Sequence, residues 1–161
     1  MDKNVNKRFL AVIGGFALLA AVPVVSAQAR GIPQIININT QADMASIKGL
    51  PKDRKHVNSF SHARHAKDYL KGKEKYSTYP YSDAFTCSAC HPGAKSEKAL
   101  LAADPAATLS ASLDKVGGPR KLMKYFHNIC RQCHKKVKKA GIVSGPTNCN
   151  GCHGRKVGSE K

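Results

Sequence analysis

The 161-residue chain contains no tryptophan, and aromatic residues make up only 6% of it. Acidic side chains are also few: 10 Asp and Glu stand against 27 Lys and Arg, which gives a formal net charge of +17 at pH 7. A chain of this size with so few large apolar side chains is poorly equipped to build an ordinary hydrophobic core. We therefore expect something other than side-chain burial to supply much of the interior.

Long apolar runs are absent except near the N-terminus, at residues 9–25. Basic residues precede this run and small residues follow it, which is the order of a secretory signal peptide. The sequence predicts such a signal over residues 1–29 and a single exported domain over residues 30–161. An uncleaved membrane anchor is the alternative, because the run approaches the length that spans a bilayer.

Cysteine outside a motif is missing too, because all six cysteines belong to three copies of Cys-x-x-Cys-His at residues 87–91, 130–134 and 149–153. This pattern is the attachment signature of c-type haem, in which both sulfurs bond to the haem and the histidine binds its iron. Disulfides, a redox dithiol or half a zinc site would not require a histidine after every second cysteine. We therefore predict three covalently attached c-type haems. The predicted thioether residues are Cys87, Cys90, Cys130, Cys133, Cys149 and Cys152, and the predicted proximal iron ligands are His91, His134 and His153.

Four histidines remain outside the motifs: His56, His62, His65 and His127. They matter because iron with a second protein ligand only exchanges electrons, whereas an open iron can bind a substrate. His62 and His65 are three residues apart in a segment, residues 61–70, that suits a helix, so they project from neighbouring places on one face and could reach two different haems. Two surface histidines or a zinc pair are the alternatives, although no nearby carboxylate or cysteine completes a zinc site.

His127 lies three residues before the second motif, on a helix predicted over residues 120–139. It faces the side from which that motif's own haem is held, so we expect it to bind the iron of another haem; a partly exposed histidine beside the cofactor is the alternative. His56 is left over and is expected to be structural or solvent-facing. Met44 and Met123 could also serve as distal ligands, although Met123 more naturally fills a helix face.

Secondary-structure signals are short and scattered. Residues 32–39 and 56–60 are candidates for a small N-terminal hairpin. Residues 96–103 are predicted to be helical until Asp104-Pro105 breaks the helix, and the longer helix over residues 120–139 carries the second motif. The predicted fold is a small haem-packed protein, mostly irregular, with a few short helices and a two-stranded N-terminal hairpin. Without haem the chain should be largely unfolded.

These features resemble the class III multihaem c-type cytochromes, specifically the triheme cytochrome c7 type related to the tetrahaem cytochrome c3. The resemblance is carried by Phe-Ser-His-Ala-Arg-His at residues 60–65, by His127 before the second motif, and by Gly-Pro-Thr-Asn-Cys at residues 145–149. It covers roughly residues 32–155 in the order of features. The family's tetrahaem members have a histidine directly after the first motif for their extra haem, and here Pro92 stands there.

The resemblance implies that every iron has two histidine ligands and no open position, which is the state of an electron carrier rather than an enzyme. The segments between the distal histidines and the first motif, and between the first and second motifs, are longer than in compact members, so helices or partner contacts could be added there. The implied pairs are His62 with His91, His65 with His134, and His127 with His153.

Positive charge gathers in the last third of the chain, because residues 115–159 contain eleven Lys or Arg and no Asp or Glu. A positive face near a haem edge would steer acidic redox partners into transient contact, at rates that fall as salt rises. A generally basic surface with no single docking patch is the alternative, and nucleic acid is not an expected partner of an exported haem protein. The candidate docking residues are Lys135, Lys136, Lys138, Lys139, Arg155 and Lys156.

The resemblance implies partners such as periplasmic hydrogenase, formate dehydrogenase or membrane-bound multihaem complexes. The sequence thus predicts a periplasmic electron carrier of anaerobic respiration. Two alternatives stay open: a haem-bearing subunit of a membrane respiratory complex, which needs the N-terminal segment to be retained, and a multihaem reductase with one open iron.

Overall fold

The computed structural model describes residues 31–52 and 54–154. The predicted signal peptide over residues 1–29 lies outside these ranges, as do the candidate docking residues Arg155 and Lys156. Within the described ranges, no helix has both the length and the apolar character needed to cross a membrane.

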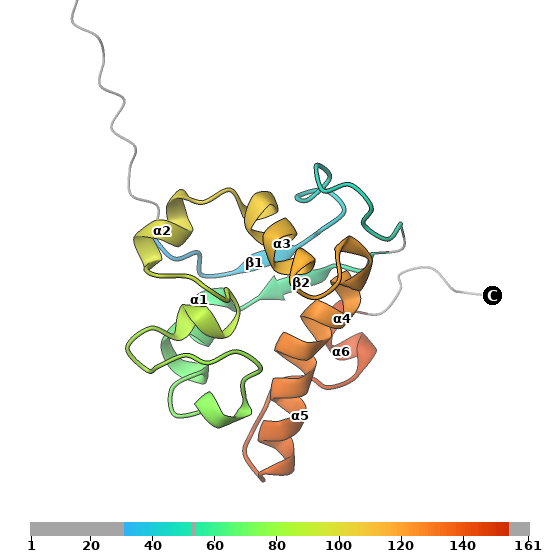
Figure 1. Ribbon diagram of the computed structural model, residues 1–161. Coiled ribbons are helices and arrows are strands. Elements are labelled where there is room, and N and C mark those ends of the chain that lie inside the picture. Colours follow the sequence, from blue (N-terminus) through green and yellow to red (C-terminus); the bar gives the residue numbers. More distant parts are fainter. Residues whose placement is uncertain (1–30, 53, 155–161) are drawn as a thin grey trace, which may run out of the picture.

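A two-stranded antiparallel sheet opens the described chain (Figure 1), with β1 at Ile36–Ile38 and β2 at Val57–Phe60. The pairing is irregular, because a single residue of β1 faces two residues of β2 between the paired ends. Ser59 in this bulge has a φ of 53°, and its amide donates a hydrogen bond to Oδ1 of Asn37 at 2.9 Å. The predicted N-terminal strand pair is confirmed, and residues 39–56 connect the strands.

The helical segment predicted over residues 61–70 is present but is not one regular helix. It begins as α1 at His62–Arg64 and continues as a π-turn at His65–Tyr69. Two 3-10 turns follow at Glu74–Tyr76 and Thr86–Ala89, and the second of these contains the start of the first Cys-x-x-Cys-His motif.

Two short helices, α2 at Glu97–Ala102 and α3 at Pro105–Asp114, lie between the first and second motifs. The helix predicted over residues 96–103 is α2. Its predicted end at Asp104 is correct, but α3 was not expected. Asp104 accepts a hydrogen bond from the amide of Ala106 at 3.0 Å, and a proline at the first helical position needs no amide partner. The Asp-Pro pair therefore ends one helix and begins the next.

The long helix predicted over residues 120–139 is continuous but contains three kinds of helical turn. A 3-10 turn at Pro119–Lys121 leads into α4 at Leu122–Phe126, a π-turn follows at His127–Arg131, and α5 at Gln132–Lys139 ends the segment. The third motif forms its own helix, α6 at Cys149–His153, which packs on β2. Figure 1 shows α4 and α5 as one rod with α6 beside it.

A small core of side chains forms where α3 meets α4 and the π-turn after it. Two of the motif cysteines, Cys90 and Cys130, pack against it, as does Met44. Met123 does not fill a buried helix face, because 69% of its surface is exposed. The core is made by Ile47, Ala106, Leu109, Leu113, Leu122, Tyr125 and Ile129. The segment between the first two motifs, which contains α3, thus packs against the rod that carries the second motif and holds it in place.

Candidate functional site

Six histidines lie in three pairs, and each pair joins one motif histidine to one histidine from outside the motifs. A metal–imidazole bond is about 2 Å long and the ring centre lies about 1.2 Å behind the nitrogen, so two imidazoles on opposite sides of one metal have ring centres roughly 6.3 Å apart. The observed separations match this value. They are 6.3 Å for His62 and His91, 6.2 Å for His65 and His134, and 6.4 Å for His127 and His153.

Four of the six imidazoles are held by a backbone carbonyl at Nδ1. A carbonyl only accepts hydrogen bonds, so Nδ1 must carry the proton and Nε2 keeps a free lone pair. Metal-binding histidines are usually fixed in this way. The bonds run from His62 to Pro33 at 3.2 Å, from His65 to Ser61 at 2.9 Å, from His134 to Pro146 at 2.9 Å and from His153 to His56 at 2.9 Å.

Burial lowers the pKa of three of the six paired rings, those of His65, His91 and His127, and so favours their neutral form. It lowers the pKa of His65, and the nearby charges of His134 and His62 lower it further, against the hydrogen bond to Ser61, which raises it. Burial also lowers the pKa of His91, with a smaller contribution from the charge of His62. Neutral imidazole is the form that binds a metal ion.

The two π-turns decide where His65 and His127 point. Each of these histidines occupies the first position of a π-turn. On a regular α-helix, residues seven apart such as His127 and His134 would point within about 20° of each other. The extra residue of the π-turn rotates His127 by about 100° relative to His134. One rod therefore presents His127 to His153 on α6 and His134 to His65.

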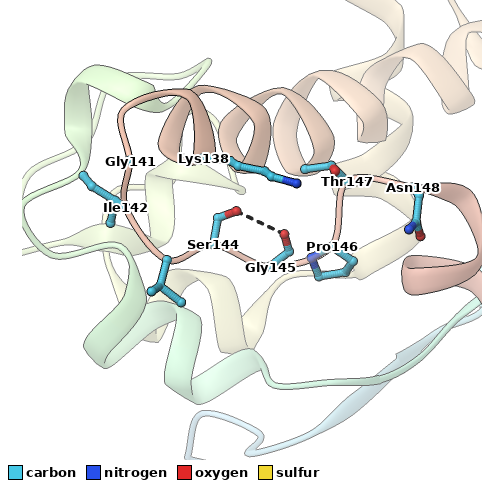
Figure 2. Close-up of a pocket in the computed structure, with 9 residues that line it drawn as sticks. Lys138, Gly141, Ile142, Ser144, Gly145, Pro146, Thr147 and Asn148 are labelled. Atoms are coloured by element: carbon cyan, nitrogen blue, oxygen red, sulfur yellow. Dashed lines mark hydrogen bonds between the residues drawn. The ribbon is translucent and has the colours of Figure 1, made fainter.

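A loop closes over His134 between α5 and α6. Figure 2 shows it running from Gly141 to Asn148, where it lines a surface pocket of about 470 Å³ together with Lys138. At Gly145 the backbone comes so close to His134 that an added Cβ would lie 2.5 Å from Cε1 and 2.9 Å from Nε2 of the ring. Only glycine leaves room for the imidazole at this position.

The six motif cysteines all lie among the described residues, and none of them forms a disulfide. Burial raises the pKa of Cys90 to about 12, and the charges of Cys130 and Cys133 add to the effect. Burial also raises the pKa of Cys130 to about 11, with a contribution from Cys152. The thiols of the second motif are thus close enough to interact electrostatically with those of the other two. Their apolar setting suits the edge of a bound macrocycle better than a reactive thiolate.

A second pocket, of about 260 Å³, reaches Cys87 of the first motif. Its lining combines the apolar side chains of Ile32 and Phe85 with charged residues such as Lys67. The described residues therefore fit a bound c-type haem: paired thiols, opposed imidazoles with fixed tautomers, and open space beside the motifs.

The other candidates from the sequence have different positions. His56 is exposed, and it contributes its backbone carbonyl rather than its ring. No group of three or more His, Cys, Asp or Glu in residues 31–52 and 54–154 could hold a metal ion, so His62 and His65 lack the partners for a zinc site. The described docking candidates Lys135, Lys136, Lys138 and Lys139 are all exposed on α5.

Sequence reasoning missed five backbone features of this site. Four are the carbonyls of Pro33, His56, Ser61 and Pro146, for which no side chain gives a signal. The fifth is Gly145. Its place four residues before the third motif was a usable signal, because glycine often marks a close backbone approach.

Comparison with known proteins identifies one related family. The family model described as the class III cytochrome C family matches residues 37–153. No curated protein and no solved structure gives a significant match. The matched range begins in β1 and ends at the last residue of α6, so it contains all three motifs and all six paired histidines.

Proposed function

The chain belongs to the class III cytochrome c family. From this premise we propose that it is an electron carrier with three c-type haems, and that two histidines bind the iron of each haem. Family membership gives the covalent c-type haem and electron transfer as the general activity. The observation that carries the rest is the pairing of six histidines at the separation that one iron between two imidazoles requires.

In this proposal the chain's own residues bind, orient and space the cofactors. Bound haem would supply one-electron transfer, and two histidines at each iron would leave no place there for a substrate. Each cysteine pair fixes one edge of a haem. The carbonyls at Nδ1 hold the imidazole planes and strengthen the nitrogen donors on the opposite side of each ring.

Under this ligand set, the second haem site shares one helical segment with the first site and another with the third. His62 and His65 stand about 4.5 Å apart along one helical segment, at a rise of 1.5 Å per residue. His127 and His134 likewise share the rod of α4 and α5. Each shared helix joins a ligand of the second site to a ligand of a neighbouring site, so the spacing between sites is set by rigid elements.

The distal histidines also favour a carrier over a reductase. A reductase needs one iron with an open position. That would require one of His62, His65 or His127 to turn away from its partner, and all three lie at ligand-pair separation.

We further propose that the protein works in the periplasm, in anaerobic respiration, and meets acidic redox proteins through α5. Export is supported by the pattern of residues 1–29. Docking is supported by the four exposed lysines of α5, which directly follow His134 in the chain. A periplasmic hydrogenase, formate dehydrogenase or membrane multihaem complex with an acidic face would fit this charge.

EPR of the oxidised holoprotein tests the ligand set. The wild type should show only low-spin iron. His127→Ala should convert one haem, the one attached at Cys149 and Cys152, to high spin. The matched control is His56→Ala, because the exposed ring of His56 has no ligand role in the proposal. High-spin iron in the intact wild type, or an all-low-spin His127→Ala variant, would exclude the assignment.

N-terminal sequencing of the exported protein separates the free carrier from a subunit anchored in a membrane complex. A start near residue 30 supports the carrier. A start at Met1 or Asp2 would mean that the apolar run is retained.

A further inference from the structure

Both π-turns receive a threonine hydroxyl from a distant part of the chain. The first π-turn ends its helix at Tyr69, and the second leads into α5. At either kind of π-turn end, the carbonyl that follows the last i+5 bond is left without a helical amide donor. In the first π-turn the amide of Leu70 donates to the carbonyl of His65 at 3.2 Å, and Thr86 Oγ1 donates to the next carbonyl, that of Ala66, at 2.5 Å.

The second π-turn repeats the arrangement. The amide of Gln132 donates to the carbonyl of His127. Thr78 Oγ1 then donates to the next carbonyl, that of Asn128, at 2.6 Å. In both cases the accepting carbonyl belongs to the residue directly after a distal histidine, and the donor is a threonine outside the helix.

These bonds differ from the other threonine bond to a helical carbonyl in the described chain. Thr108 Oγ1 donates to the carbonyl of Asp104, the N-cap of its own helix, at 2.9 Å. Such local bonding is common and serves no distant element. Thr78 and Thr86 instead lie 50 and 20 residues from their acceptors, so each ties a separate segment to a π-turn.

On the basis of the proposed ligand set, we infer that Thr78 and Thr86 are positioning residues that hold His127 and His65 in place to bind iron. A π-turn that relaxes to α-helix loses one residue of rotation, which is about 100°. The histidine at its first position would then turn away from its partner. The threonine hydroxyl stabilises the π-turn by giving that carbonyl a donor.

Removal of the Thr86 hydroxyl should affect the second haem site and not the first. Thr86 immediately precedes Cys87 of the first motif and is buried, with 5% of its surface exposed. Its bond, however, fixes the turn that begins with His65, which faces His134 of the second motif. A residue that only supported its own neighbourhood would influence the first haem.

The test uses Thr78→Val and Thr86→Val in the holoprotein, because valine keeps the shape of threonine and removes the hydroxyl. Carbon monoxide binds reduced haem with two histidine ligands only after one histidine has left the iron, so its binding rate reports how firmly the distal ligand is held. The loss of one hydrogen bond should raise that rate about two- to tenfold. NMR of the oxidised protein, in which each haem gives its own methyl resonances, identifies the haem that changes.

Thr78→Val should affect the haem attached at Cys149 and Cys152, and Thr86→Val the haem attached at Cys130 and Cys133. Thr78→Ser and Thr86→Ser keep the hydroxyl and should restore the wild-type rate. Thr108→Val is the matched control and should leave the rate unchanged.

Unchanged rates in both valine variants would overturn the inference, and so would a Thr86→Val effect confined to the haem at Cys87 and Cys90. Should Thr86→Val fail to incorporate haem, Thr78→Val decides, because Thr78 is exposed and its replacement leaves the packing intact. Failure of the underlying ligand set looks different: the wild type itself would then show high-spin iron or bind carbon monoxide without delay.

Discussion

Gly145→Ala should disturb the second haem site through a single added methyl group. Gly145 has an ordinary backbone conformation, so alanine meets no backbone strain there. The added Cβ would lie 2.5 Å from Cε1, 2.9 Å from Nε2 and 3.0 Å from Nδ1 of the His134 ring. Ordinary contact begins at 3.4 Å, so the ring or the loop has to move by about 0.9 Å at the closest contact.

Neither the ring nor the loop is free to move. His134 donates to the carbonyl of Pro146 at 2.9 Å, and Arg131 ties the next residue of the loop by donating from Nε to the carbonyl of Thr147 at 3.0 Å. Overpacking of this kind costs about 1–3 kcal/mol. If that cost falls on the bond between His134 and iron, the ligand should dissociate about 5- to 150-fold more readily. Carbon monoxide binding to the reduced holoprotein measures this change, and the thermal unfolding midpoint should fall in parallel.

Gly31→Ala is the matched control, because a Cβ on Gly31 meets nothing within 4 Å and its backbone is also ordinary. It should leave both the ligand dissociation and the unfolding midpoint at their wild-type values. If Gly145→Ala gives the same spectra, carbon monoxide kinetics and midpoint as Gly31→Ala, then the loop does not confine His134 and the proposed second site is built differently.

Three further predictions concern docking, ligand orientation and folding. Lys135→Glu combined with Lys138→Glu should slow electron exchange with an acidic redox protein several-fold at low salt and little at high salt, measured by stopped-flow absorption; equal slowing at both would remove the docking surface. The ring planes of His62 and His91 cross at 85°, against 36° and 49° in the other pairs, so this site should give the most anisotropic low-spin EPR signal of the three; three alike signals would contradict the ring geometry. The chain produced without haem should be largely unfolded by circular dichroism despite the core around α3, and a native-like spectrum would show that side chains alone suffice.

The sequence was most informative where covalent chemistry restricts residue choice. Thioether attachment requires two cysteines and a histidine at fixed spacing, so the sequence predicts the motif residues without any knowledge of the fold. The strands at Ile36–Ile38 and Val57–Phe60 and the helix through the second motif were also predictable, because β-branched runs and helical periodicity are local signals.

Other features depend on contacts that no local pattern records. The Asp104-Pro105 pair was interpreted as a helix end, yet the same two residues also begin α3, because an N-cap and a first-turn proline look identical to a break when read from the preceding helix. The carbonyls that fix four imidazoles carry no residue preference at all. A carbonyl can be identified as the acceptor for an imidazole only once the fold places that part of the backbone beside the ring.

The π-turns have the largest effect among these features, because they change the relative direction of two side chains at a given separation in the sequence. Residues seven apart, such as His127 and His134, share one face of a helix if every residue turns by about 100°. Both histidines would then point toward the same neighbouring site. With one extra residue between them the same two side chains diverge, and a single rod brings His127 to His153 and His134 to His65. The prediction that His127 serves a haem other than that of the second motif rested on α-helical geometry, whereas the direction of its ring in the structure depends on the π-turn. The information that selects the π-turn includes Thr78, which lies 50 residues from its acceptor, and helical periodicity cannot detect it.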